Sequence, residues 1–134
     1  AGVTDKVSEM WGHIGNQMGF LESMAAAAQS VHDYFGNGER ILYINVMNNM
    51  SIDCDCNAYP AAPLLKDIGI LASTDPVALD QACIDLVTQV KPEEGNDNAP
   101  LLERIKSRHG THTIDHAEKI GLGSKKYTLI SIDK

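Results

Sequence analysis

The chain has few aromatic residues and no long apolar run. Aromatic residues make up 5% of its 134 residues, so its core has to be built from aliphatic side chains, methionine and alanine. No apolar run approaches the roughly 20 residues that a membrane-spanning helix needs. The opening stretch, AGVTDKVSEM, lacks the apolar region of a signal peptide. We therefore expect a cytoplasmic protein with no membrane partner.

Positive charge is also scarce. The net charge is −7, and the lysines and arginines are scattered rather than gathered into a stripe, which argues against a nucleic-acid partner. The length is close to that of one domain, so residues 1–134 are expected to form a single domain with a weakly patterned lead-in over residues 1–16. Because the chain begins without methionine, we expect it to be a fragment of a longer protein.

Several familiar motifs are absent from the sequence. It contains no GxGxxG, no Walker loop, no G-x-S-x-G and no CxxC. It has three cysteines, and a disulfide between Cys54 and Cys56 would close a small, strained ring. Together with the missing secretion signal, this predicts reduced thiols.

The spacing of apolar and turn residues predicts a helix-rich α/β chain. Apolar residues from Met18 to Phe35 recur at intervals of three and four, which is typical of a helix. Asp75 is suited to cap a helix that starts at Pro76. The expected helices span residues 18–35, 76–89, 99–108 and 113–123, and the expected strands span 40–47, 66–72 and 126–132.

Strands that alternate with helices predict an α/β fold with a small sheet of about three or more strands, partly parallel and flanked by helices. The first two strands read as buried, and the first as central in the sheet. The edges of so small a sheet need covering, which suggests part of a larger domain or a homo-oligomer.

The stretch SIDCDCNAYP (51–60) is the strongest candidate for chemistry. In an extended chain Cys54 and Cys56 face one way, while Asp53 and Asp55 face the other. Three interpretations stay open. The loop is merely polar, or its thiols provide some of the ligands of a metal site or cluster, or one thiol is a nucleophile. Two thiols cannot supply four ligands alone, and the neighbouring carboxylates disfavour a thiolate.

Two further acids are candidate ligand-binding residues. Asp75 has a sufficient structural role as a helix cap. On a helical wheel Asp80 lies between Ile84 and Val87, inside the apolar arc, where a carboxylate needs a partner or a ligand unless it reaches solvent. Cys83 lies on the apolar stripe of the same helix and is expected to be a core thiol.

Histidines and asparagines give weaker signals. His109, His112 and His116 either form a zinc-binding group or serve as surface and capping residues. Asparagines 45, 48 and 49 flank the end of the strand before the cysteine loop. If the first two strands are parallel neighbours, these asparagines, the two cysteines and Asp75 meet at one rim of the sheet.

Three segments carry a resemblance to a known family. INVMNNMSIDCDC, DIGILASTDPVALDQACIDLV and HAEKIGLGSKKYTLISI resemble the C-terminal portion of the family catalogued as domain of unknown function 362, over about Met18 to Ile132. The resemblance implies an iron–sulfur or ferredoxin-linked parent protein, whose ferredoxin-type cysteine segment would precede this region. Such a cluster would not be held by this chain alone, and that preceding portion would be a partner.

Three classes of function follow. In the first, the chain is a domain of an iron–sulfur-linked protein whose Cys/Asp loop contributes to a metal or small-ligand site in a redox setting. Alternatively, it is a structural or interaction domain with no chemistry of its own. The third class is an enzyme that uses Asp80 or Cys54 on a small substrate.

Overall fold

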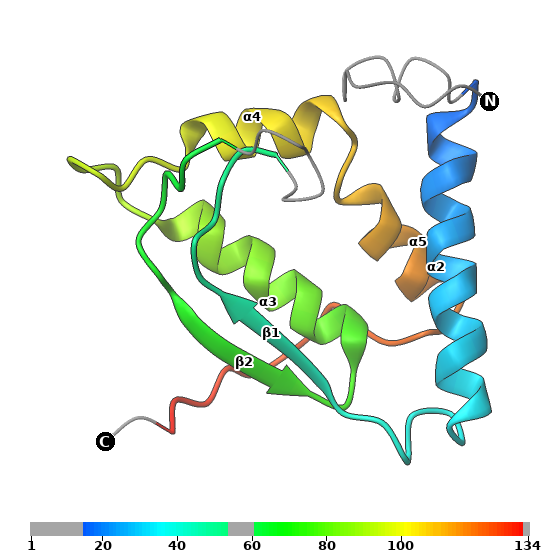
Figure 1. Cartoon of the computed structure of the whole chain (residues 1–134). Coiled ribbons are helices and arrows are strands. Elements are labelled where there is room, and N and C mark those ends of the chain that lie inside the picture. Colours follow the sequence, from blue (N-terminus) through cyan, green and yellow to red (C-terminus); the bar gives the residue numbers. More distant parts are fainter. Residues whose placement is uncertain (1–14, 54–60, 133–134) are drawn as a thin grey trace.

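Four helices and a sheet of two strands are formed by residues 15–53 and 61–132, the part of the chain that the computed structural model describes. Helix α3 packs on one face of the sheet, and helices α2 and α5 pack against each other beside it (Figure 1). The mixed α/β class predicted from the sequence is confirmed. The elements are α2 (Gln17–Tyr34), β1 (Tyr43–Met47), β2 (Gly69–Ser73), α3 (Pro76–Gln89), α4 (Ala99–Ser107) and α5 (His112–Lys119).

The helices begin and end where local residues satisfy their free backbone groups. The Asn16 side chain accepts a hydrogen bond from the Gly19 amide at the start of α2, and Asp75 caps α3 in the same way. After α2 the chain turns through Gly36 and Gly38, both at positive φ, where a side chain would be strained. The predicted helices are confirmed to within a few residues at each end.

The two strands pair antiparallel, so the predicted parallel pairing is wrong for the described sheet. Tyr43 lies opposite Ser73, and Met47 lies opposite Gly69. A parallel pair needs a crossover connection, usually a helix, whereas an antiparallel pair can be joined by a loop. The described parts of the connection between β1 and β2 contain no helix.

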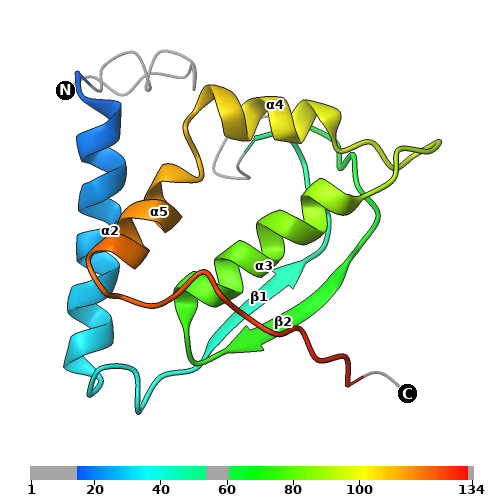
Figure 2. The same ribbon diagram turned by 180° about the vertical axis from the view of Figure 1, so that it is seen from behind.

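The third predicted strand, residues 126–132, is wrong for this structure. This segment is extended but makes no strand pairing within the described residues. Its Tyr127 hydroxyl donates a 2.8 Å hydrogen bond to Asp85 on α3, and the segment (red in Figure 2) crosses α3. A strand-like pattern is not sufficient to form a strand, because a ladder needs a neighbouring strand within reach.

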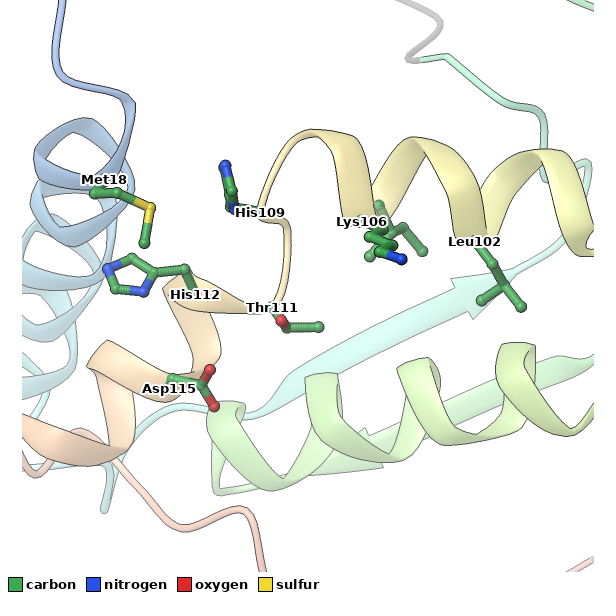
Figure 3. A pocket seen from close by; sticks show the side chains of 8 residues that line it. Met18, Leu102, Lys106, His109, Thr111, His112 and Asp115 are labelled. Carbon is green, nitrogen blue, oxygen red and sulfur yellow. The ribbon is translucent and has the colours of Figure 1, made fainter.

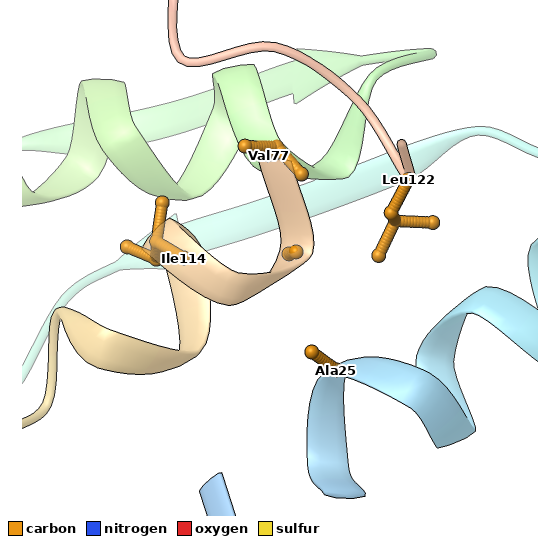
Figure 4. Packing of buried hydrophobic residues seen from close by; sticks show 5 residues of the cluster. Ala25, Val77, Ile114 and Leu122 are labelled. Carbon is orange, nitrogen blue, oxygen red and sulfur yellow. The ribbon is translucent and has the colours of Figure 1, made fainter. Parts of the chain in front are cut away.

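The core consists of two apolar clusters on either side of α3. One cluster joins α2, α3 and α5 and includes Ala25, Val77, Ile114 and Leu122, whose side chains converge in Figure 4. The other cluster lies between α3, α4, the sheet and the segment before β2, and is built on Met47, Leu65 and Val87. Aliphatic side chains supply both, as the low aromatic content predicts.

The outer face of the sheet is apolar and uncovered in the described structure. Ile44, Val46 and Ile70 are 57%, 56% and 71% exposed, whereas Met47 on the inner face is buried. The prediction of buried strands is therefore wrong for this face. Among the helices of the described ranges, α3 packs against both strands, on their inner side.

Polar side chains tie the helices together at their ends. Gln17 and Gln29 of α2 donate to the carbonyl oxygens of Arg108 and Ile120, which end α4 and α5. The buried Asn98 amide donates to the Val87 carbonyl at 2.8 Å, at the last turn of α3. These bonds satisfy carbonyl groups that a helix leaves unpaired at its C-terminus. Among the helices of the described ranges, none is both long and apolar enough to cross a bilayer.

Candidate functional site

A groove runs along the free edge of β1. It has a volume of about 380 Å³ and lies between β1, α3 and α4. Its apolar lining and few polar groups are typical of a surface that binds an extended or apolar ligand. We call it the β1-edge groove; it is lined by Ile44, Asn45, Val46, Met47, Met50, Cys83, Ile84, Val87, Leu101 and Ile105.

The edge of β1 beside the groove has no strand partner among the described residues. The sheet contains β1 and β2 only, and β2 occupies the other edge of β1. An unpaired edge presents a row of backbone donors and acceptors that another strand can use. The groove thus combines free backbone groups with an apolar floor, which is the combination needed for strand addition.

Asn45 and Cys83 are the polar residues that line the groove, and Asp80 lies beside it, bonded to Asn45. The Asn45 side-chain amide donates to Asp80 Oδ1 at 2.9 Å and to Cys83 Sγ at 3.4 Å. Burial, and more weakly the Asp80 charge, raise the pKa of the Cys83 thiol, against the opposing effect of the Asn45 hydrogen bond. Cys83 is half-buried and packs against the second cluster, as predicted for a core thiol.

Asp80 reaches solvent, which is one of the outcomes that the sequence leaves open for it. Asp80 lies between Ile84 and Val87 around α3, as the wheel indicates, but its residue is exposed. The reason is that the groove beside it is open, so the apolar arc of α3 is only partly covered. Asp80 lacks the burial that distinguishes a perturbed acid–base residue.

Asp75 has the structural role of a helix cap that the sequence predicts, and it also joins α3 to residues near the C-terminal segment. Its Oδ1 accepts hydrogen bonds from the Val77 and Ala78 amides at 2.9 and 3.0 Å, and its Oδ2 accepts one from the Ser124 amide at 2.9 Å. Any Cβ on Gly123 would overlap the Asp75 carboxylate, so glycine is required there. The segment GLGS, residues 121–124, therefore does more than end a helix. It docks on the cap of α3.

The predicted common rim of asparagines and Asp75 is also wrong. Because β1 and β2 are antiparallel, residues that follow β1 lie beside the start of β2, and Asp75 follows the other end of β2. Consistent with this, the Asn49 amide bonds to Asp67, just before β2, at 3.0 Å. Asp75 instead lies near the start of β1, where burial and its charge raise the pKa of Tyr43.

Of the Cys/Asp loop, only Asp53 lies in the described residues. Arg104 on α4 holds both of its oxygens, with Nε 3.2 Å from Oδ1 and a terminal nitrogen 3.3 Å from Oδ2. Cys54, Asp55 and Cys56 lie outside the described residues. Within the described ranges, no three His, Cys, Asp or Glu side chains are arranged to hold a metal ion.

Two of the three histidines contact α2, and two of them line a second hollow. His112 Nε2 and His116 Nδ1 on α5 lie 3.1 and 3.6 Å from one oxygen of Glu22 on α2. His109 ends α4 at positive φ and is exposed. Figure 3 shows His109 and His112 in a hollow of about 420 Å³ between α2, α4 and α5, together with Lys106 and Asp115. The described residues thus favour surface and packing roles over a zinc-binding trio.

The sequence did not reveal the groove, nor the hydrogen bond by which the Asn98 side chain caps the C-terminal end of α3. Asn45 was singled out only for its place near a strand end, and its real partners, Asp80 and Cys83, lie on α3. A signal was present, because inward positions of a strand rarely carry an amide unless it has a partner. Ile84 and Ile105 carry no local mark of a groove, since apolar helix residues usually belong to the core.

Comparison with known protein families agrees with part of the resemblance. A family model described as "Domain of unknown function (DUF362)" matches residues 1–85, more than half of the chain. The match contains α2, both strands and most of α3, and therefore Asn45, Asp80 and Cys83. The third resembling segment, residues 116–132, lies beyond it. No curated protein and no solved structure matches the chain.

Proposed function

The chain belongs to the DUF362 family, a domain of unknown function, and we propose that it is an interaction domain whose sheet is completed by a strand from another polypeptide. The observation that carries this proposal is the β1-edge groove. There, an edge of β1 that has no strand partner among the described residues borders an apolar floor formed by α3 and α4.

The shape of the sheet supports strand addition. A two-stranded sheet is marginal by itself and usually gains stability from a third strand or a covering layer. Here α3 covers the inner face, but Ile44 and Val46 remain exposed on the outer face next to the groove. A strand added along β1 would pair the free backbone groups and bury the Ile84 and Ile105 side chains.

Polar groups at one end of the groove would select the added strand. The Asn45 amide, which is bonded to the Asp80 carboxylate beside the groove, lies at one end, and Met47 and Met50 lie towards the other. Polar groups that are buried by a partner need hydrogen bonds, so a strand with a donor at one end and apolar side chains at the other would fit best.

Selection of peptides from a displayed random library against the whole chain tests the proposal. We expect enriched sequences to alternate apolar and other residues, as strands do, and to bind wild type but not Val46→Lys, which places a charge at the groove. Ile70→Lys is the matched control, because Ile70 lies opposite Val46 on β2, shares its outer face and does not line the groove. Binders that ignore Val46→Lys, or no enrichment at all, would refute the proposal.

A second candidate function is that the Cys/Asp loop contributes ligands to a metal or cluster site in an iron–sulfur-linked protein. What supports it is the anchoring of Asp53 by Arg104, which fixes the start of the DCDC stretch to α4. The described residues do not supply a ligand set by themselves. Cys54 and Cys56 could therefore provide at most two thiolates, with the other ligands coming from elsewhere.

Metal and sulfide analysis of the anaerobically purified chain tests this candidate. We expect bound metal in wild type and its loss in Cys54→Ser/Cys56→Ser, with unchanged folding by circular dichroism. Cys83→Ser is the matched control, because that thiol belongs to the core and should not affect metal content. Equal metal content in all three proteins, or none in any, would contradict a ligand role for the loop.

A further inference from the structure

We propose that the strand received by the β1-edge groove is the C-terminal segment, residues 126–132, of a second copy of this chain. The inference rests on the proposed function and names the occupant. It predicts a dimer in which each copy inserts its segment into the groove of the other. Such an exchange is reciprocal, so one twofold axis would satisfy both grooves.

The segment has the properties of a strand that lacks a sheet. The sequence KYTLISI alternates as a strand does, yet the segment has no ladder partner in the described residues. Leu129, Ile130 and Ile132 are 55%, 76% and 90% exposed. Large apolar side chains in a row at such exposure indicate a surface that is buried in an assembly.

The segment and the groove match in polarity. If Thr128 lies beside Asn45 in a parallel pairing, Ile130 lies beside Met47 and Ile132 extends towards Met50 and α4. The apolar residues of the segment then reach the apolar end of the groove. The Thr128 hydroxyl would lie near the Asn45 and Asp80 side chains at the polar end.

The charge of the segment is also opposite to the charge beside the groove. No acidic residue occurs from Lys119 to Ile132, although the chain as a whole carries a net charge of −7. Lys126 and Asp80 are exposed, and neither side chain has an ion-pair partner among the described residues. The parallel pairing directs Lys126 of one copy towards Asp80 of the other, and this opposite charge opposes the repulsion between two acidic molecules.

The anchoring of the segment favours a second molecule over its own groove. Tyr127 is bonded to Asp85, and the Ser124 amide is bonded to Asp75. Asp85 is five residues from Asp80, which places it about 140° around α3 from the groove. Insertion into the same molecule would have to break the Tyr127–Asp85 bond. Residues 128–132 and the Lys126 side chain can instead contact a neighbour while that bond stays in place.

Sedimentation velocity of the whole chain over a range of concentrations tests the inference with a charge exchange. Wild type should dimerise, and Ile130→Asp should weaken the dimer about a hundredfold. Asp80→Lys and Lys126→Asp should each weaken it about tenfold, because each puts like charges together. An equimolar mixture of these two variants should dimerise like wild type, since every groove then meets a segment of opposite charge.

Each other result overturns the inference in a distinct way. One such result is a chain that stays monomeric at all concentrations and loses stability in each single charge variant but not in the double variant Asp80→Lys/Lys126→Asp. It would show that the segment inserts into its own groove. A dimer that is insensitive to Ile130→Asp and to both charge variants would form through another surface. If strand-like peptides still bound the groove while a peptide of residues 124–132 did not, the proposed function would stand and this occupant would be wrong.

Discussion

Two carboxylates in the first half of α3 show two ways in which such a group can serve this fold. At the first end Asp75 accepts three backbone hydrogen bonds and joins α3 to the segment before the C-terminal stretch. One turn later Asp80 accepts a single bond from Asn45 and faces an open groove. The first carboxylate is fully used within the chain, whereas the second retains free acceptor capacity.

This difference teaches where stability and where interaction reside in the molecule. We call the contacts among Asp75, Val77, Ala78, Gly123 and Ser124 the Asp75 corner. A site whose polar groups are satisfied internally contributes to folding, and changes there should destabilise the chain. A site with exposed apolar residues and free backbone groups contributes little to folding, and changes there should alter association instead.

The largest expected effect is that of Asp75→Ala. This variant removes a helix cap and leaves the Ser124 amide without its acceptor, so the free energy of unfolding should fall by about 2–4 kcal/mol. Urea unfolding followed by circular dichroism measures it. Asp75→Asn is the control, because it keeps a capping oxygen and should lose less than alanine. Equal losses for the two variants would mean that capping is not the role of Asp75.

The second largest loss of stability is expected for Gly123→Ala. The added methyl group overlaps the Asp75 carboxylate, so GLGS must move away from the cap, at a cost of about 1–3 kcal/mol. The same unfolding measurement applies. In the Asp75→Ala background the overlap disappears, and Gly123→Ala should then cost much less. Additive losses would contradict a direct contact between the two positions.

Alkaline pH should lower stability by a smaller amount. The folded state raises the pKa of Cys83 and Tyr43, chiefly by burial, and that of Tyr127 through its hydrogen bond to Asp85. Groups with a raised pKa hold their protons more tightly when folded. Their stabilisation is therefore complete below the ordinary thiol pKa of about 8.5 and is lost as pH rises through the folded values.

Unfolding measured from pH 7 to 11 checks this prediction. Tyr127→Phe should reduce the slope of stability against pH, because it removes one of the titrating groups. Alkylation of Cys83 in a Cys54→Ser/Cys56→Ser background should be slower than that of an unfolded thiol at the same pH. A stability that rises with alkaline pH would contradict the direction of all three shifts.

The smallest effect on stability should come from the groove. Val46→Lys and Ile70→Lys replace exposed side chains and should each change the free energy of unfolding of the monomer by no more than about 0.5 kcal/mol. Measurement at low protein concentration isolates the monomer. A loss above about 2 kcal/mol for Val46→Lys would mean that this side of the sheet contributes to the core, and the comparison between the two sites would fail.

Local rules predicted most of the elements in this chain. Asp75 followed by Pro76 marks the start of α3, and the spacing of apolar residues marks α2, because capping and helical periodicity depend on neighbours only a few residues apart. The same reasoning could not distinguish parallel from antiparallel pairing. It also could not reveal that residues 126–132 pair with no strand in the part of the chain that the structure describes, since pairing is decided by residues far away in the sequence.

The candidate site divides in the same way. Cys83 was predicted as a core thiol from its position on the helix and lies against the core. Asp80 was placed correctly around the helix, but its exposure was left open, because burial depends on what covers the helix. The ligand role of Cys54 and Cys56 stays a prediction, and Asp53 alone of that loop is seen to be held, by Arg104.

By itself, the sequence determined the α/β class, the aliphatic core, the helix starts and the cap at Asp75, because each follows from composition or from short-range geometry. Only the tertiary structure decided that β1 and β2 are antiparallel, that Gly123 packs on Asp75, and that β1 borders an open groove beside Asp80. These features arise where segments distant in the chain meet. Free energies of such contacts depend on geometry that no local pattern encodes.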